Sequence, residues 1–359
     1  MILTECQFYK YHLSLKESLQ IGKITINNRK GVIVRLKTDS DKYGFGEAAP
    51  LPGFHQENLT DTISQLKALK PSLIGISLEN VYKMIDTHFQ KNPGYPSLQF
   101  AIESAIEELD TTGKNHNRTS ILSEPEHDQI FVNLLVTGNY NSVMRKIDQS
   151  RPQNYRAIKV KVGRNSLEEE IRLIHDIQKK IGKSASLRLD ANRSWTIEEA
   201  ISFTRNIDSS SIEYIEEPLK NYKLLEDLYQ KTGLPIAVDE SLIELSPKVL
   251  EKAKWINTII LKPAVLGSLK NTYHYISLGK KTGVKMVISD TFHSGIGLSF
   301  LIRLASTIPD DIPMGFDTYN WLAEDILIER PTVQNGCFDL KTVMDLSTKV
   351  DYSKLEKVG

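Results

Sequence analysis

The chain has 359 residues, of which 40% are hydrophobic and 25% charged, an ordinary composition for a globular protein that is longer than most single-core domains. Its 45 basic and 45 acidic residues balance, so composition gives no electrostatic reason to expect nucleic acid or an anionic membrane as a partner. Two distant cysteines, no signal-peptide pattern and no membrane-spanning apolar run favour a reduced, cytoplasmic setting, and the oligomeric state stays open.

The first third of the chain predicts an α+β domain, over residues 1–120. β-Branched alternation in Ile21–Ile26 and Gly31–Lys37 predicts two strands joined by a turn at Asn27–Lys30. From about Gln56 onward, apolar residues recur at three- and four-residue spacing, which is typical of helices. We expect this domain to cap a second one.

The remainder of the chain alternates between strand and helix patterns. The polar segment Thr111–Gln129 predicts the connection between domains, and the alternation then runs from Ile130–Val136 to about Phe316. It predicts a TIM-type (β/α) barrel over residues 121–330. Residues 331–359 lose the period, and we expect this tail to pack back on the first domain.

Five apolar runs of the predicted barrel each end in a lysine or an acid, at nearly constant intervals. The residues are Lys161, Asp190, Glu216, Asp239 and Lys262, and the intervals are 29, 26, 23 and 23 residues. A strand, its loop and a crossover helix need about that length of chain, so each residue marks one βα unit. Strand ends of a barrel converge on one face, so we expect all five side chains around one cavity.

The three acids predict a site for a hard metal. Asp190, Glu216 and Asp239 supply oxygen ligands from separate strands, which suits Mg²⁺, whereas the eight histidines form no metal-binding pattern. Neighbouring residues of a strand alternate in direction, so we predict that Glu216 faces the cavity and that Glu217 and Glu240 have supporting positions. The alternative is that these acids only cap the following helices.

The lysines predict acid/base chemistry. Lys159 and Lys161 are two residues apart, so they project from one side of a strand and their repulsion lowers the proton affinity of one amine. Such an amine can act as a general base near neutral pH. The alternative is that both lysines point outward to solvent, and the same alternative applies to Lys262.

Three loops are candidates for binding the substrate. The segment Ala48–Asn58 is rich in Pro and Gly and carries aromatic residues, which suits a lid that excludes water. Ser289–Gly297 and Gly315–Thr318 would follow the last two barrel strands, where backbone N–H groups often bind anions. Each could also be an ordinary turn. The residues that we expect near the substrate in these loops are Pro52, Gly53, Ser289 and Gly315.

The motifs in this order resemble those of the enolase superfamily, in its muconate-lactonising branch and, within that branch, the o-succinylbenzoate synthase family. The resemblance covers GFGEAAPLPGF, KVKVG, LRLDANRSW, IEEPL, VDESL, IILKPAVLGSL, VISDTFHSGIGL and IPMGFDT. Dipeptide epimerases usually carry a DxD pair near the last strand, where this chain has Gly315-Phe316-Asp317. The pair Asp290-Thr291 departs from the serine-rich run of many synthases.

The resemblance implies a modified TIM-type barrel with an N-terminal α+β capping domain that dehydrates 2-succinyl-6-hydroxy-2,4-cyclohexadiene-1-carboxylate, a small anionic carboxylate. It implies Mg²⁺, which Mn²⁺ could replace, stabilising an enediolate. Lys161 would remove the proton and return it to the leaving hydroxyl, and Lys262 would support the charge. Arg188 and Asn192 would bind substrate or hold Asp190, or be paired for structure alone.

Two other functions remain open from the sequence. A dipeptide epimerase or N-acylamino acid racemase would use Lys161 and Lys262 as paired acid and base on either side of one α-carbon. A non-catalytic metal-binding barrel would keep the carboxylates, but it would not need two opposed lysines.

Overall fold

The computed structural model describes residues 1–109, 122, 124–150 and 154–358. The predicted connection Thr111–Gln129 falls mostly outside these residues, as does the predicted domain boundary at residue 120. Within the described part of the chain, no helix is both long enough and apolar enough to span a membrane.

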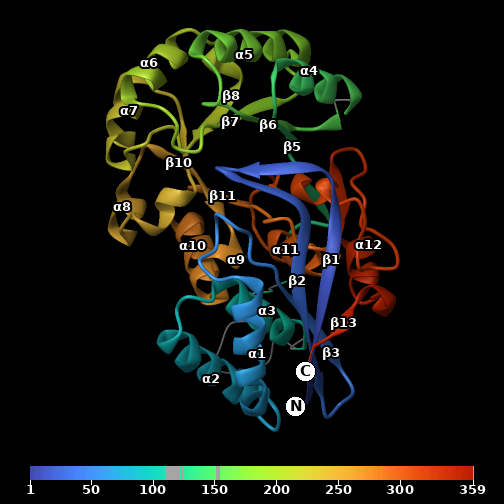
Figure 1. The fold of residues 1–359 in the computed structure, drawn as a ribbon. Coiled ribbons are helices and arrows are strands. Elements are labelled where there is room, and N and C mark those ends of the chain that lie inside the picture. Colours follow the sequence, from blue (N-terminus) through green and yellow to red (C-terminus); the bar gives the residue numbers. More distant parts are fainter. Residues whose placement is uncertain (110–121, 123, 151–153, 359) are drawn as a thin grey trace.

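The N-terminal domain has two layers, a four-stranded sheet of order β13-β1-β2-β3 and three helices (Figure 1). Its strands are antiparallel, and its apolar face packs on the helices. The elements are β1 (Leu3–Ile21), β2 (Ile24–Thr38), β3 (Tyr43–Ala48), α1 (Leu59–Leu73), α2 (Leu78–Lys91), α3 (Pro96–Leu109) and β13 (Glu356–Lys357).

Two glycines of β3 set how closely helix α3 approaches the sheet. A Cβ added at Gly46 would lie 1.8 Å from the carbonyl oxygen of Ala101, and one at Gly44 would lie 2.0 Å from that of Ala105. Only glycine leaves room for the helix backbone at these two positions. The pattern Gly-Phe-Gly is therefore a packing feature of the sheet.

The β1–β2 hairpin differs from the sequence prediction. Strand β2 begins at Ile24, which pairs with Ile21, so the turn lies at Gly22-Lys23 and the prediction of a turn at Asn27–Lys30 is wrong. Gly22 has a φ of +55°, which a tight two-residue turn requires and glycine adopts without strain. The polar run from Asn27 continues as strand because β1 supplies its partners, across a register shift between Ser14 and Leu19.

Seven parallel strands form the second sheet, in the order β11-β10-β9-β8-β7-β6-β5, with helices around its outside (Figure 1). The strands are β5 (Leu134–Val136), β6 (Ala157–Lys161), β7 (Ser186–Asp190), β8 (Ile212–Glu216), β9 (Ile236–Val238), β10 (Ile256–Leu261) and β11 (Lys285–Ile288). The helices are α4 (Tyr140–Gln149), α5 (Leu167–Ile181), α6 (Ile197–Arg205), α7 (Leu225–Thr232), α8 (Pro247–Lys252), α9 (Pro263–Leu266), α10 (Leu269–Thr282), α11 (Gly295–Ala305) and α12 (Leu340–Ser347).

The segment around Met314 closes this sheet into a barrel. The Met314 N–H donates to the carbonyl of Phe131 (2.7 Å), and the Asn133 N–H donates to Met314 (3.0 Å). On the other side, the Gly315 N–H donates to Ile288 (2.8 Å). Two isolated bridges thus stand where a regular eighth strand was expected.

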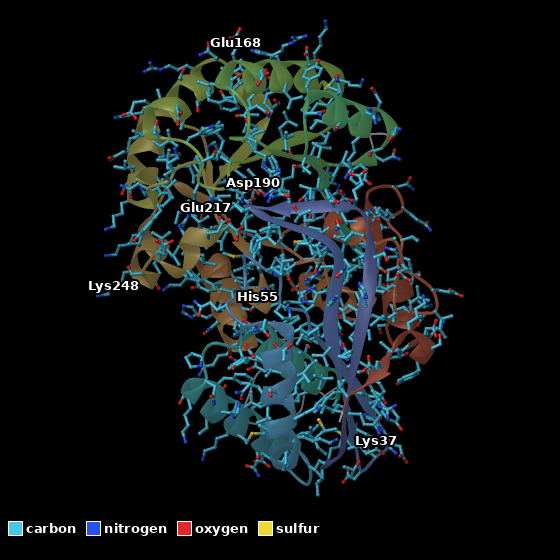
Figure 2. All side chains as sticks on the ribbon, viewed as in Figure 1. Lys37, His55, Glu168, Asp190, Glu217 and Lys248 are labelled. Atoms are coloured by element: carbon cyan, nitrogen blue, oxygen red, sulfur yellow. The ribbon has the colours of Figure 1, made fainter. Side chains whose placement is uncertain are left out.

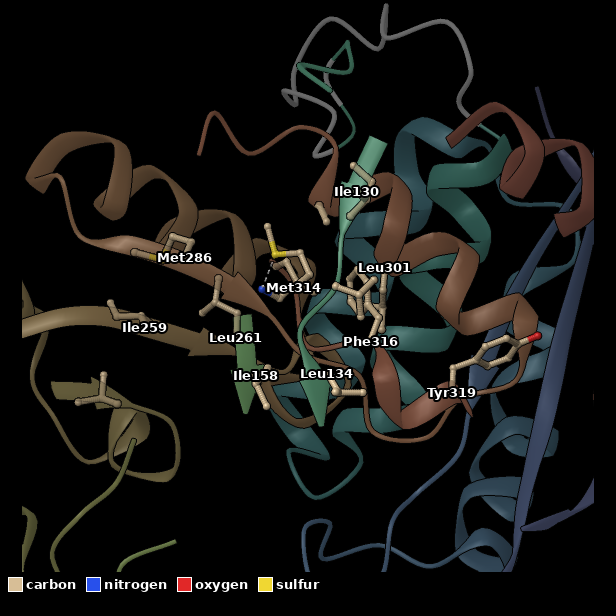
Figure 3. Packing of buried hydrophobic residues seen from close by; sticks show 14 of the residues in the cluster. Ile130, Leu134, Ile158, Ile259, Leu261, Met286, Leu301, Met314, Phe316 and Tyr319 are labelled. Carbon is tan, nitrogen blue, oxygen red and sulfur yellow. Dashed lines mark hydrogen bonds between the residues drawn. The ribbon is translucent and has the colours of Figure 1, made fainter. Parts of the chain in front are cut away.

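Apolar side chains of the barrel strands make one continuous core with the surrounding helices. Figure 3 shows Ile158, Leu134, Leu261 and Met314 as members of this core. Each such burial stabilises the fold by roughly 1.5–3 kcal/mol. This core holds the strand ends in fixed relative positions.

The chain returns to the N-terminal sheet at its end. Strand β12 (Cys337–Asp339) pairs with β4 (Gln129–Phe131), and β13 then pairs with β1 through Lys357 opposite Tyr9. In Figure 1 the red end of the chain runs alongside the blue sheet.

Candidate active site

Register in the barrel brings the predicted residues to one level. Lys161 of β6 is the Cα partner of Asp190 in β7, and Asp190 is the partner of Glu216 in β8. Asp239 directly follows β9 and Lys262 directly follows β10. All five therefore lie at the carboxyl ends of neighbouring strands, and Figure 2 labels Asp190 and Glu217 close together there.

The two lysines of β6 point inward. Lys159 Nζ lies 2.8 Å from Asp190 Oδ2 and 2.8 Å from Glu216 Oε1, so it joins two carboxylates. Lys161 Nζ lies 2.5 Å from Asp190 Oδ2 and 2.7 Å from Asn192 Oδ1. The alternative in which both lysines face solvent does not describe this structure.

Lys262 stands on the opposite wall of the site. Its ammonium group is ion-paired with Asp239, and its side chain is 13% exposed. Strands β7, β8 and β9 separate β10 from β6 in the sheet order, so Lys161 and Lys262 flank the carboxylates from two sides.

The electrostatics separate the three lysines. Burial lowers the pKa of Lys161, and the neighbouring Lys159 lowers it further against the opposing pull of Asp190. Burial also acts on Lys159, but Asp190 and Glu216 together raise its pKa well above the usual range. For Lys262, burial is outweighed by Asp239 and the pKa is raised. Repulsion thus acts on Lys161 in the direction that the sequence predicted.

The three carboxylates fit a divalent cation by their chemistry. In the part of the chain that the structure describes, no three acidic, histidine or cysteine side chains are arranged as a metal site, and the ammonium groups of Lys159 and Lys262 lie against the acids. Glu216 Oε2 accepts no hydrogen bond, although Lys159 Nζ is 2.6 Å away outside hydrogen-bond geometry. Burial, followed by Asp190, raises the pKa of Glu216 well above its usual range. A hard cation would relieve this crowding of negative charge.

Glu217 supports the site from behind. It is fully buried and has a φ of +41°, which turns its carboxylate away from that of Glu216. It accepts hydrogen bonds from the N–H groups of Asp239 and Ser241, both 2.8 Å, and from Arg193 Nε at 3.0 Å. Glu217 therefore fixes the backbone that carries Asp239.

Asn192 and Glu240 connect the two sides. Asn192 accepts from Lys161 and donates to Glu240 Oε1 at 3.2 Å. Burial and the neighbouring Asp239 raise the pKa of Glu240 to about 7. Both residues border the cluster, in the positions that the sequence suggested.

Arg188 lies deeper in the barrel than a substrate contact would. It is fully buried and donates through Nε and Nη2 to Glu213 at 2.8 and 3.1 Å, and through Nη1 to the carbonyl of Pro313 at 2.6 Å. These bonds engage the Arg188 guanidinium group, and none of them goes to Asp190, Glu216 or Asp239. Of the two readings left by the sequence, structural pairing describes Arg188.

The segment Ala48–Asn58, called here the capping loop, reaches the Lys262 side. Lys262 Nζ lies 4.7 Å from the centre of the Phe54 ring, within range of a cation–π contact. His55 accepts from the Leu51 N–H (3.0 Å) through Nδ1, so its Nε2 carries the proton shared with the carbonyl of Ala264 at 3.1 Å. Neither Phe54 nor His55 was singled out from the sequence, although aromatic residues in a Pro/Gly loop were the available signal.

Pro52 and Gly53 form the bend of the capping loop. Gly53 has a φ of +88°, and a Cβ there would lie 2.8 Å from the Ile21 side chain at the tip of the β1–β2 hairpin. Both residues therefore shape the loop where it meets the hairpin, and a substrate contact stays a prediction.

The segment Ser289–Gly297, called here the rim loop, begins beside Gly315. A Cβ added at Gly315 would lie 2.7 Å from Ser289 Oγ, so these two residues are in direct contact at the barrel mouth. Asp290, whose role the sequence left open, accepts from His293 Nδ1 (2.6 Å) and from Thr318 Oγ1 (2.8 Å). It thereby ties the rim loop to the segment after Gly315.

Two family descriptions match the chain. Residues 3–109 match the MenC N-terminal domain, and residues 142–352 match the enolase C-terminal domain-like family. The o-succinylbenzoate synthase of Pectobacterium atrosepticum is 30% identical over 92% of this chain and 94% of its own length. The o-succinylbenzoate synthase of Haemophilus influenzae is 28% identical over 93% of this chain and 95% of its own length.

Solved structures share the fold at lower identity. A dipeptide epimerase from Cytophaga hutchinsonii, complexed with Mg and the dipeptide D-Ala-L-Val, has a TM-score of 0.84 at 23% identity and covers 100% of this chain and 99% of its own. The L-Ala-D/L-Glu epimerase from Bacillus subtilis has a TM-score of 0.83 at 22% identity, with 94% and 96% covered. The prediction of a TIM-type barrel with an α+β capping domain is confirmed.

A capped barrel whose strand ends carry two opposed lysines and three acids defines an enzyme of the enolase type. The agreement of both domains with known families narrows this class. The chain belongs to the enolase superfamily and, within it, to the o-succinylbenzoate synthase family.

Proposed function

We propose that the chain is a hydro-lyase that converts 2-succinyl-6-hydroxy-2,4-cyclohexadiene-1-carboxylate into o-succinylbenzoate for menaquinone biosynthesis. The observation that carries this proposal is the pair of lysines, Lys161 and Lys262, on opposed walls of one carboxylate cluster. The relatives named o-succinylbenzoate synthase support the choice of substrate.

The residues divide the work of the elimination. Asp190, Glu216 and Asp239 would hold a divalent metal, Mg²⁺ or Mn²⁺, which supplies positive charge to the substrate carboxylate when bound. Lys161 takes the α-proton as the C–H bond breaks, and its ammonium form gives a proton to the hydroxyl as the C–O bond breaks and water leaves. Lys262 stays protonated and stabilises negative charge from the other face.

The loops would select the substrate. The capping loop would cover the succinyl side. The N–H groups of Gly297 and Gly315 already donate to Glu47 and to the carbonyl of Ile288, so the expectation that these two glycines present N–H groups to a substrate carboxylate is wrong. A small anionic carboxylate suits a mouth lined by Lys159, Lys161 and Lys262. The two buried free cysteines agree with the reduced, cytoplasmic setting that we propose for the protein.

The second candidate is an epimerase of dipeptides or N-acylamino acids, favoured by the likeness to solved epimerases. Asp317 argues against it. This carboxylate is 3% exposed, accepts from the Leu135 N–H (2.8 Å) and from Asn320 (2.8 Å), and lies 3.7 Å from Lys146. It is therefore engaged within the protein, where a dipeptide's ammonium group would need a free acid.

The test uses purified protein with Mg²⁺. The protein is incubated with the cyclohexadiene acid and, in a separate experiment in D₂O, with a panel of L,L-dipeptides. We expect rapid dehydration, followed by absorbance of the aromatic product, and negligible α-deuteration of the dipeptides. Fast deuteration of dipeptides without dehydration would establish the epimerase instead. Metal binding without either reaction would leave the non-catalytic barrel.

A further inference from the structure

The Arg29 side chain is fully buried in an unusual setting. It extends from β2 and is 1% exposed. Among the described residues, no carboxylate lies within ion-pair distance of its guanidinium group. Its hydrogen bonds go to main-chain carbonyl groups of four residues: Ala49 (2.6 Å), Pro50 (3.3 Å), Phe292 (3.1 Å) and Thr291 (3.3 Å).

These four carbonyl groups belong to two loops that are far apart in the sequence. Ala49 and Pro50 start the capping loop, whereas Thr291 and Phe292 lie in the rim loop of the barrel. One planar guanidinium fork therefore joins a loop of the N-terminal domain to a loop at the barrel mouth. Its rigid geometry suits this task, because all donors are fixed relative to one another.

Glu47 also bonds the rim loop, but as a hydrogen-bond acceptor where Arg29 is a donor. It is fully buried in β3 and accepts hydrogen bonds from the N–H groups of Ser294 (2.8 Å) and Gly297 (2.9 Å), at the start of α11. Arg29 thus holds carbonyl groups of the rim loop, and Glu47 holds its N–H groups. Together they determine the loop from both sides.

The conformation of the rim loop depends on this grip. Phe292 has a φ of +61°, which a residue with a bulky side chain rarely adopts without support, and its carbonyl oxygen accepts from Arg29 Nε. Burial lowers the pKa of Arg29, against the opposing influence of Tyr11, Glu47 and Asp290. Burying a cation without a bonded carboxylate is costly in free energy. The contacts of Arg29 with the two loops give a reason for placing a cation there.

We infer that Arg29 is a positioning residue for the substrate: it holds the capping loop against the rim loop, so that Phe54 reaches Lys262 and Ser289 stays beside Gly315. Arg29 touches no reacting group, and it acts through the two loops. The part of this inference that concerns substrate affinity rests on the proposed function, whereas the coupling of the loops does not.

The first test measures amide hydrogen exchange in the full chain with Mg²⁺ and no substrate. We expect Arg29→Met to raise exchange at least tenfold in residues 48–58 and 289–297, but not in strands β7 and β8. Arg29→Lys should lie between, because one ammonium group cannot reach both loops. Arg35→Met is the matched control, since Arg35 lies on the same strand but bonds Gln7 and Tyr352 near the surface.

The second test separates positioning from general stability. With the cyclohexadiene acid, Arg29→Lys should raise KM at least tenfold and lower kcat less than threefold, while Arg35→Lys changes neither. Unchanged loop exchange with unchanged KM would overturn the inference, as would exchange that rises evenly over the whole chain. If Arg29→Met does not fold, Arg29→Lys alone carries both measurements. The protein could prove inactive on this acid while Arg29→Met still raises amide exchange in the two loops. That result would count against the proposed substrate only.

Discussion

The two lysines of β6 differ in how strongly they are held. Lys159 bonds two carboxylates, whereas Lys161 bonds one carboxylate and the amide oxygen of Asn192. Lys161 would therefore lose fewer ion pairs than Lys159 when its amine turns from the protein to the substrate proton. Lys159 is better placed to balance the charge of Asp190 and Glu216.

We therefore predict that Lys161→Ala loses both dehydration and exchange of the substrate α-proton with D₂O. Removing one member of a catalytic unit commonly costs several kcal/mol of transition-state stabilisation, on the order of a 10³-fold loss in kcat/KM or more. Isotope exchange followed by NMR gives the measurement. An active Lys161→Ala variant beside an inactive Lys159→Ala variant would reverse the two assignments.

A second prediction concerns the metal. EDTA should abolish activity, and Mg²⁺ or Mn²⁺ should restore it. Asp239→Asn should weaken Mg²⁺ binding at least tenfold, because the substitution removes one of three anionic ligands. Calorimetric titration measures the affinity independently of turnover, with Asp227→Asn on helix α7 as a control. Full activity after exhaustive removal of metal would contradict the assignment.

At the level of elements, the closure of the barrel depends on the contact between Gly315 and Ser289. A Cβ at Gly315 would lie 2.7 Å from Ser289 Oγ and 3.2 Å from Ser289 Cα, so a larger residue must push the two segments apart. We predict that Gly315→Val raises KM more than it weakens Mg²⁺ binding, and that it lowers the melting temperature. Gly94→Val is the matched control, because nothing lies within 4 Å of a Cβ there. A KM equal to that of the unchanged chain would refute this role.

Local patterns were enough to predict the strand ends, and less so the connections between them. Asp190, Glu216 and Asp239 each follow a short apolar run, so spacing alone located them. The turn at Gly22 was missed because the polar residues after Ile26 look like a turn until their partners in β1 are known. The isolated bridges at Met314 and Gly315 were also missed, because each is a single pairing, with Val132 or Ser289, outside the regular strands. Arg29 and Glu47 gave no signal, since their partners in the rim loop lie more than 200 residues away.

Across the whole molecule, a buried histidine links stability to pH at the junction of barrel and cap. Burial acts to lower the pKa of His293, but its hydrogen bond with Asp290 outweighs burial and the pKa is raised. A raised folded-state pKa contributes stability that is complete below the unfolded value, about 6.5, and is lost as pH rises through the folded value. The charged or titratable groups facing His293 are Asp290, Glu47, Arg29 and His55.

We predict that the free energy of unfolding falls as the pH rises above about 6.5, and that His293→Gln reduces this fall. Denaturant titrations at constant Mg²⁺ between pH 6 and 9 provide the measurement. His12→Gln, which replaces an exposed histidine on β1, serves as the control. Equal slopes for His293→Gln and the unchanged chain would remove His293 from the pH dependence.

The pairing of β13 with β1 has a consequence for the order in which the protein is made. Ribosomes deliver β1 early, while Glu356 and Lys357 emerge only after every strand of the barrel. Until then the edge of β1 at Tyr9 and Lys10 lacks its strand partner, and an unpaired edge can act as a template for pairing with other chains. The pairing of β13 therefore forms only after the barrel strands have been made, so this part of the β1 edge is covered late in the order of the chain.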